Sequence, residues 1–427
     1  MALRWLPCGA LLVVACTARP AGAPSTPATE PATQPFHVAL PVLAMAERAA
    51  NQDDMAEASR LFQLALPLGV RSREMFFEAA WMASRRGAVD VAFADLEGLR
   101  ALGIADTRKI ETRQDLEPVR RDPRWPAWLE HATAAARPVY DPDAARISTD
   151  DVDRFWKAYD DAKAASDPAA IYDREYVDPA SPALQAFLAL RVGTAEDLAA
   201  RVREYAPYYE SVRTSTLRVR ALEPRFRAMY RRLRELVPDA TFPDVTFVIG
   251  GLKSQGSSTV DGLIIGAEQA CRMPDSPLDG MEPRQRDLLG SFDDLDHLVA
   301  HELVHFQQHF GSEASLLDQA LKEGGADFVA ELISGATLNG KLQAYGDAHE
   351  AELWSEFRAE TRSTDGTVKS RWLYGGPPTP DRPRDLGYYV GYRVARAYYR
   401  SHSESRRALR DILDVTDSQS FLEASGY

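Results

Sequence analysis

The spacing of apolar residues along the chain predicts a mostly helical protein with one short β-rich segment. From position 36 to about 131, and again from 150 to 236, apolar residues recur three and four positions apart, as in amphipathic helices. Positions 245–249 and 263–265 are instead runs of β-branched and apolar residues, which favour strands. Beyond position 290 the pattern is again mostly helical. We therefore expect an α+β fold that is mostly helical.

Changes in this pattern divide the chain into five segments. The Gly- and Ser-rich stretch 250–262 is expected to join the two strands as a wide hairpin or flap. The expected boundaries are an apolar leader at 1–16, a tether rich in Pro, Ala and Thr at 17–35, a helical arm at 36–132, an aperiodic linker at 133–148 and a larger domain at 149–427.

The arm contains a repeat with a period of 34 residues, which is the period of the tetratricopeptide helix-turn-helix unit. Only about two units are visible, whereas a free-standing array usually needs three, so the arm is expected to lean on its neighbours. It is either a docking surface for a protein partner or a helical spacer on the larger domain. The matching small and apolar positions are Ala49, Met55, Ala58 and Gly69, followed by Ala83, Val89, Ala92 and Gly103.

Composition excludes two classes of function. The chain has 427 residues, with 50 Lys and Arg against 63 Asp and Glu, so its formal net charge is −13. Because nucleic-acid binding depends on neutralising phosphates with basic side chains, we expect no nucleic-acid partner. With 3 Cys in total, the chain can form neither a disulfide-rich scaffold nor a four-Cys zinc site.

The first sixteen residues are typical of a secretion signal, with Arg4 before an apolar run that is too short to span a bilayer. The stretch 12–16, which ends at Cys16, resembles the bacterial lipobox, and this resemblance implies that Cys16 is acylated. We expect a lipid-anchored protein of the bacterial cell envelope, on the periplasmic side of the outer membrane. The alternative is an ordinary signal peptide that is cleaved further on, near 21–23.

Four of the 8 His in the chain lie four positions apart, at 297, 301, 305 and 309. On a helix, residues four apart share one face, so two imidazoles can reach one ion. The pattern His301-Glu302-x-x-His305 is typical of zinc hydrolases, in which the two His bind Zn²⁺ and the Glu points at the open coordination position. A single zinc ion has no place for His297 and His309, which are expected at the surface or rim.

A catalytic zinc needs a third protein ligand, for which Glu323 is the expected residue. A second helix that returns after Gly311 would bring Glu323 opposite the two His, with Asp327 one turn further on to accept the free ring N–H of a ligand His. If the helices are offset differently, Asp327 or Glu331 takes the place of Glu323. Two consecutive glycines, Gly324 and Gly325, destabilise a helix interior, and a close approach of these two helices would explain their presence.

These motifs carry a family resemblance. His-Glu-x-x-His followed after seventeen residues by Glu-x-x-x-Asp resembles the gluzincin branch of zinc metallopeptidases. Residues 148–400 more narrowly resemble the bacterial predicted zinc-dependent proteases related to the gliding-motility lipoprotein, and this resemblance implies a zincin core but no particular substrate. The further shared elements are the aromatic helix at 155–159, the Gly-rich segment at 247–251, Glu-Gly-x-Ala-Asp at 323–327 and Gly-Tyr-Tyr-x-Gly-Tyr at 387–392.

The ligand chemistry predicts a mechanism. Zinc would activate water, Glu302 would serve as the general base, and Tyr388 or Tyr392, one turn apart, would stabilise the oxyanion unless both only pack. The strand at 245–251 is the expected edge for pairing with an extended substrate.

We therefore expect a zinc metallopeptidase that acts on a peptide or protein. One alternative is a non-catalytic envelope lipoprotein for binding or assembly with a structural or vestigial metal site, and another is hydrolysis of a non-peptide amide. Glu302 favours an enzyme, because a purely structural site needs no base. Cys271 is expected as a lone buried or half-buried thiol, and no Gly-x-Ser-x-Gly nucleophile motif is present.

Overall fold

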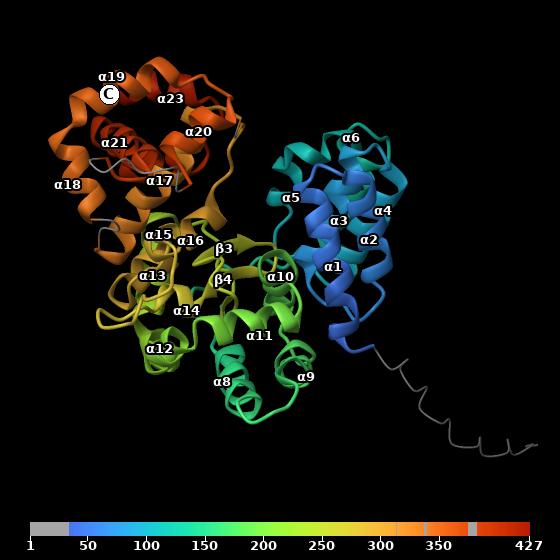
Figure 1. Cartoon of the computed structure of the whole chain (residues 1–427). Coiled ribbons are helices and arrows are strands. Elements are labelled where there is room, and N and C mark those ends of the chain that lie inside the picture. Colours follow the sequence, from blue (N-terminus) through green and yellow to red (C-terminus); the bar gives the residue numbers. More distant parts are fainter. Residues whose placement is uncertain (1–33, 313, 337–339, 375–381) are drawn as a thin grey trace, which may run out of the picture. The chain divides into compact units, whose positions relative to one another are not determined.

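The computed structural model describes residues 34–312, 314–336, 340–374 and 382–427, and they are mostly helical with one small mixed sheet (Figure 1). The α+β class expected from the sequence is therefore confirmed. The predicted leader at 1–16, its Cys16 and nearly all of the tether lie outside the described residues. Within the described ranges, no helix is both long and apolar enough to cross a membrane.

The helices and strands follow one another along the chain in this order. In the arm they are α1 (Phe36–Asn51), α2 (Met55–Ala65), α3 (Arg73–Arg85), α4 (Val89–Ala101), α5 (Arg108–Thr112), α6 (Glu117–Arg120) and α7 (Trp125–Ala135). The middle of the chain forms β1 (Ile147–Ser148), α8 (Asp150–Ala162), α9 (Pro168–Tyr172), α10 (Pro182–Phe187), α11 (Ala195–Glu204), α12 (Ala206–Arg218), α13 (Glu223–Leu236), β2 (Val245–Val248), β3 (Gly256–Thr259), β4 (Gly262–Gly266), α14 (Ala267–Ala270) and α15 (Pro283–Asp287). The last part forms α16 (Leu295–Gln307), α17 (Leu316–Ser334), α18 (Gly340–Ala348), α19 (Glu350–Glu360), α20 (Gly366–Trp372), α21 (Leu386–Ser401), α22 (Ser405–Leu413) and α23 (Ser418–Ser425).

The 34-residue repeat coincides with two helix pairs, α1 with α2 and α3 with α4. Ala58 and Ala92 occupy matching places in the second helix of each pair, and both are fully buried. Gly69 and Gly103 follow the pairs in the left-handed backbone region, at φ 82° and 92°, which glycine adopts without strain. This agreement supports a repeated helix-turn-helix unit, while its assignment to the tetratricopeptide family stays a prediction.

The sheet has the strand order β1-β2-β4-β3, in which β3 alone runs antiparallel to its neighbour. The expected hairpin between 245–249 and 263–265 is therefore wrong, because β2 and β4 are parallel and the stretch between them forms β3. Gly262 makes the tight β3–β4 turn possible, with φ 118° and its carbonyl accepting from the Thr259 hydroxyl. Ile147–Ser148, at the end of the predicted linker, pairs with β2.

The Gly pair in α17 has a different partner from the one expected. A Cβ on Gly324 would lie 2.1 Å from the Tyr392 backbone nitrogen and 2.4 Å from the Tyr388 carbonyl oxygen, both in α21. A Cβ on Gly391 of α21 would lie 1.7 Å from the Ala320 carbonyl oxygen in α17. The close approach therefore joins α17 to α21, and the explanation by contact with the His-bearing helix is wrong.

This contact predicts that Gly324→Ala destabilises the protein by about 3 kcal/mol, because the methyl group would meet backbone atoms that cannot move aside. Gly366→Ala is the matched control, since nothing lies within 4 Å of the Cβ position at the first residue of α20. Urea unfolding followed by circular dichroism measures both variants. Equal unfolding midpoints for the two variants would contradict the packing argument.

Candidate metal centre

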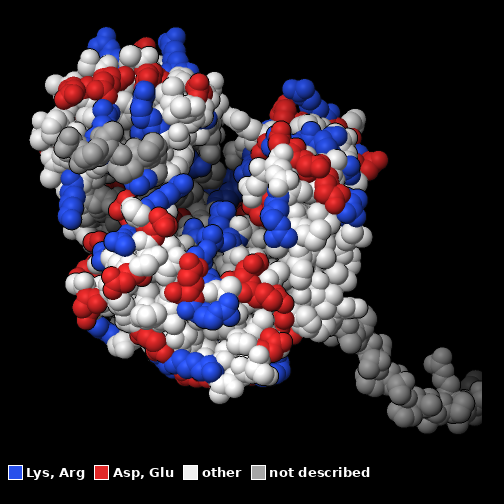
Figure 2. All heavy atoms as spheres, in the orientation of Figure 1, with Lys and Arg blue, Asp and Glu red and all other residues white. Residues whose placement is uncertain are grey.

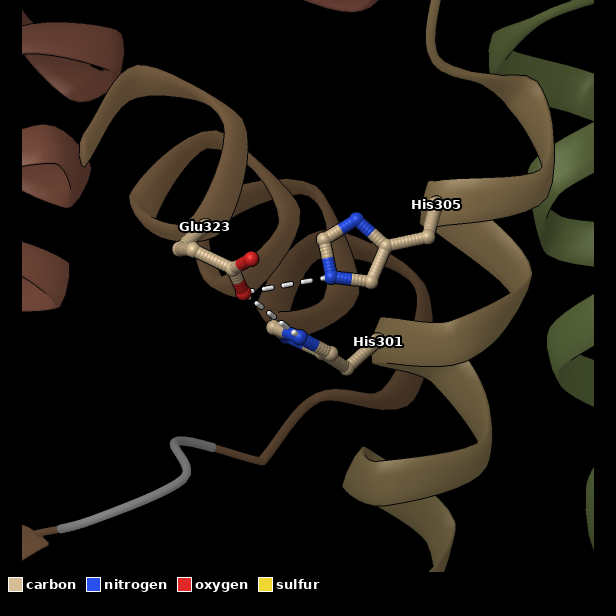
Figure 3. A group of neighbouring side chains, drawn as sticks. All are labelled: His301, His305 and Glu323. Carbon is tan, nitrogen blue, oxygen red and sulfur yellow. Dashed lines mark ion pairs between the residues drawn. The ribbon is translucent and has the colours of Figure 1, made fainter. Parts of the chain in front are cut away.

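Helices α16 and α17 bring together the residues that the sequence singles out. Almost every side chain of α16 is buried, and His301 and His305 stand one turn apart with their ring centres 4.4 Å apart and their planes at 88°. Ser315 and Asp318 form a capping box that begins α17 after the turn. Figure 3 shows both imidazoles pointing at the Glu323 carboxylate, which projects from α17.

The distances among these three side chains fit a tetrahedral metal ion. Glu323 Oε2 lies 3.6 Å from His301 Nε2 and 3.3 Å from His305 Nε2. Zinc bonds of about 2.0–2.2 Å at the tetrahedral angle would place neighbouring donor atoms about 3.3–3.6 Å apart. All three donor atoms lie within 4.8 Å of one another, so these residues form a possible metal-binding group.

The two alternatives to Glu323 as third ligand are occupied elsewhere. Asp327 Oδ1 accepts the Nδ1 hydrogen of His301 at 2.8 Å, on the ring edge away from Glu323. Glu331 accepts the Tyr392 hydroxyl at 2.9 Å. The geometry therefore favours Glu323 at the metal and Asp327 behind it, as the sequence predicts, although the assignment of ligands itself stays a prediction.

Each of the two His has its own partner on Nδ1, which leaves Nε2 turned toward Glu323. His301 donates to Asp327, and His305 donates to Gln308 Oε1 at 2.7 Å. The Gln308 amide in turn donates to the Lys322 carbonyl oxygen at 2.7 Å. Such partners fix the tautomer and the ring orientation of metal ligands. Sequence reasoning missed Gln308, whose one local signal is its place three residues after His305.

Charge interactions within this group shift the pKa values strongly. Burial alone would lower the pKa of His301, but its hydrogen bonds to Asp327 and Glu323 outweigh burial and raise the pKa well above its ordinary value. Burial alone would raise the pKa of Glu323, but the charge of His305 and the bonds from both His hold it well below its usual range. Hydrogen bonds and opposite charge therefore outweigh burial at both side chains.

Glu302 lies in a cavity of about 760 Å³ that also exposes the three donor side chains. The edge strand β3 runs against Glu302, because a Cβ on Gly256 would lie 2.5 Å from the Glu302 Oε1. Glycine at this position lets the strand backbone approach the carboxylate closely. The cavity wall also includes Lys109 and Arg113 of the arm, Lys322, residues 257–260, and Tyr374 and Tyr388.

The two candidate tyrosines have different surroundings. Tyr388 lines the cavity, and its ring stacks on His301 at 6.4 Å between ring centres. Tyr392 is buried with its hydroxyl on Glu331, so the structure does not bring it to the cavity. Sequence reasoning missed Tyr374, which lines the cavity with its hydroxyl 3.5 Å from Glu323 Oε1.

The two outer histidines of the four-residue series, His297 and His309, also have different surroundings. His297 is only 2% exposed, with its Nδ1 on the Ala336 carbonyl at 2.6 Å, so its expected place at the surface is wrong. The reason is that α17 covers this face of α16 as far as its C-terminal turn. His309 is half-buried beyond the end of α16 and contacts Asp414 at 3.0 Å.

The strand expected to bind substrate is not at an edge. β2 lies between β1 and β4, and the following backbone is also occupied. The Tyr176 hydroxyl bonds both the carbonyl and the N–H of Ile249, and the Tyr209 hydroxyl donates to the Gly250 carbonyl. The expectation for 245–251 is therefore wrong, and β3 is the edge strand that lines the cavity.

Comparison with known proteins supports the zinc chemistry. Residues 287–414 match the model of a family described as predicted Zn-dependent protease (DUF2268). This stretch contains α16, α17 and α21, and hence the whole His-Glu group. No curated protein and no solved structure gives a significant match. The relation to the gliding-motility lipoprotein stays a prediction.

We expect the purified protein to bind about one Zn²⁺ per chain and to release protons as it does so, because hydrogen bonds to Asp327 and Glu323 raise the pKa of His301, which must lose its proton to bind the metal. Zinc affinity should therefore fall as the pH falls. Metal analysis gives the stoichiometry, and calorimetry in buffers of different ionisation enthalpy counts the protons. His305→Ala should lose zinc, whereas His309→Ala should keep it; folded wild-type protein that binds no zinc would contradict the assignment.

Proposed function

We propose that this protein is a zinc-dependent metallopeptidase. The observation that carries the proposal is that His301, His305 and Glu323 converge on one point inside a cavity. The same cavity contains Glu302, the candidate general base. The match to a predicted Zn-dependent protease family over residues 287–414 supports the same chemistry. A structural site would not need an acidic side chain beside an open cavity.

Each residue has a chemical role in this proposal. Zinc held by His301, His305 and Glu323 would lower the pKa of water and polarise a scissile carbonyl. Glu302 takes the proton of the attacking water and passes it to the leaving amine. The Tyr388 phenol donates to the developing oxyanion, because burial and the charge of Glu323 raise its pKa well above the usual value and keep it protonated.

The substrate would lie along β3. Its outer edge has no neighbouring strand in the described sheet, and residues 256–260 form one wall of the cavity. An extended peptide can add to such an edge through backbone hydrogen bonds, with its side chains placed alternately. Because Gly256 contacts Glu302, a peptide bound there would pass beside the general base.

We expect Glu302→Gln to keep its zinc but to lose at least about 10²-fold in peptide hydrolysis, because the amide cannot accept the proton of water. Metal analysis and a peptide-library cleavage screen, run on the same preparations, measure the two properties. Glu352→Gln, on the exposed face of α19, is the matched control and should keep both. Unchanged turnover in Glu302→Gln would remove Glu302 as the base.

Two other functions use the same residues differently. A binding or assembly lipoprotein would hold zinc without cleaving any peptide, and the arm would dock its partner. A hydrolase for a non-peptide amide would show the same loss in Glu302→Gln on a different substrate. Glu302 beside the donor group favours an enzyme over the binding protein, and the β3 edge favours an extended peptide over a small amide.

We also propose that a lipid on Cys16 anchors the protein in the bacterial envelope, at the periplasmic side of the outer membrane. The sequence support is the apolar run that ends at Cys16 and the Pro/Ala/Thr-rich tether that follows it. In the described part of the chain the arm begins with α1 at Phe36, about twenty residues along the sequence from Cys16.

Cys16→Ser should move the protein from the membrane fraction to the soluble fraction, because the acylated side chain is lost. Fractionation of cells, followed by detection of the protein in each fraction, measures the change. Cys8→Ser is the matched control, since Cys8 lies within the same leader but before the end of the apolar run. A wild-type protein found in the soluble fraction would refute the anchor.

A further inference from the structure

A lysine from the arm enters the cavity of the candidate metal centre. Lys109 belongs to the short helix α5, far from α16 in the sequence, and lines the same cavity as Glu302. Its Nζ donates to the Ser258 hydroxyl of β3 at 2.7 Å and lies 4.8 Å from the centre of the Phe306 ring. Phe306 lies one turn beyond Glu302 on α16. Lys109 is therefore held by α16, which carries Glu302, and by β3, which packs against Glu302 at Gly256.

Lys109 has a positive charge without a matching carboxylate. In the described part of the chain, no carboxylate oxygen lies within 4.0 Å of its Nζ, whereas Arg113, the neighbouring cation in the cavity, pairs with Asp115 at 2.9 Å. Burial lowers the pKa of Lys109 to about 8, against the charges of Glu74 and Glu302. Because this pKa still lies above 7, the side chain remains mostly charged at neutral pH.

The acidic groups of the arm whose charges act on Lys109 are Glu74 and Asp106, and both are engaged with other partners. Glu74 accepts the Val260 N–H at 2.7 Å, and burial raises its pKa. Asp106 pairs with Arg108, whose hydrogen bonds and charge outweigh burial and lower the pKa of this carboxyl. In Figure 2, Lys and Arg side chains gather in the hollow between the arm and the remaining helices. A partly desolvated ammonium group in such a place favours an anionic partner.

The geometry points to a carboxylate-binding subsite at Lys109, in which the ammonium group binds a carboxylate of the peptide substrate beside Glu302. This inference rests on the proposed peptidase function and adds a substrate class to it. The carboxylate is either the C-terminal α-carboxylate of the peptide or the side chain of an Asp or Glu near the scissile bond. Ser258 and Phe306 hold the ammonium group in place for either one.

The test uses the zinc-loaded full-length protein and one peptide sequence prepared in four forms. The C-terminus is a free acid or an amide, and one position near the cleavage site is Asp or Asn. In the wild type, one of the two carboxylates should raise kcat/KM by about tenfold or more over its uncharged counterpart. A gain from the free acid identifies the terminal carboxylate as the ligand, and a gain from Asp identifies a side chain.

Lys109→Met should lose this preference, so that it cleaves the charged and the uncharged form of the peptide at equal rates, and Lys109→Arg should restore the preference. Lys109→Gln is the second neutral variant should the Met variant fail to fold. Lys163→Gln is the matched control, because Lys163 is an exposed residue after α8 that pairs with Glu210. Two results would overturn the subsite. The first is a wild type that cleaves the free acid and the amide at equal rates and also the Asp and Asn peptides at equal rates. The second is a preference for the carboxylate form that persists in Lys109→Met.

A failure of the subsite can be separated from a failure of the peptidase proposal. If the wild type cleaves none of the four peptides, the peptidase proposal fails, and calorimetry with the same zinc-loaded protein and peptides still decides the subsite. A carboxylate form that binds about tenfold more tightly than its neutral counterpart, with the difference lost in Lys109→Met, supports the subsite. Equal dissociation constants, or a difference that survives in Lys109→Met and so reflects binding to zinc alone, overturn it.

Discussion

The close contact between α17 and α21 determines where the acidic half of the candidate metal centre lies. At Gly324 and Gly391 the two backbones approach so closely that even a Cβ on either residue would overlap the other helix. Neither helix can slide or rotate without a clash, so Glu323, beside Gly324, stays turned toward α16. The same contact places Tyr388, one turn before Tyr392, against His301. A single pair of glycines thus positions a predicted ligand and a predicted oxyanion donor together.

Because His301 and Glu323 are buried, their charged and polar atoms all need hydrogen-bond or ion-pair partners. Buried charged groups are stable only when they are paired and hydrogen-bonded. The Glu323 carboxylate meets two imidazoles, and each imidazole has a second partner in Asp327 or Gln308. The same hydrogen bonds would serve with a proton or with a metal at the centre, because they occupy Nδ1 and leave Nε2 directed inward. The orientation of both imidazoles is therefore set by the protein's own hydrogen bonds.

The sequence predicts the parts of this site that depend on local geometry. A four-residue step on a helix fixes the relation of His301 to His305 whatever surrounds it, and one returning helix then suffices to place Glu323. The burial of His297 and the position of Tyr392 depend on which helix covers which face, which no local pattern encodes. The hairpin prediction was wrong for a similar reason. The β-prone runs at 245–249 and 263–265 are neighbours in the sequence and suggest a hairpin, whereas β3 lies between them in the sequence and at the edge of the sheet in space.

The arm forms part of the site, which neither of its two expected roles included. Asp261, in the β3–β4 turn, accepts hydrogen bonds from the Ser72 hydroxyl and the Glu74 backbone N–H at the start of α3, at 2.6 and 3.0 Å. The Glu74 side chain returns a bond to the Val260 N–H. These hydrogen bonds run in both directions, so they hold the start of α3 against the end of β3. Beside this contact, Lys109 of the arm forms part of the cavity wall. A simple spacer would need no such contacts with the edge strand. The arm therefore shapes the cleft in which a substrate would bind, whether or not its outer face also docks a partner.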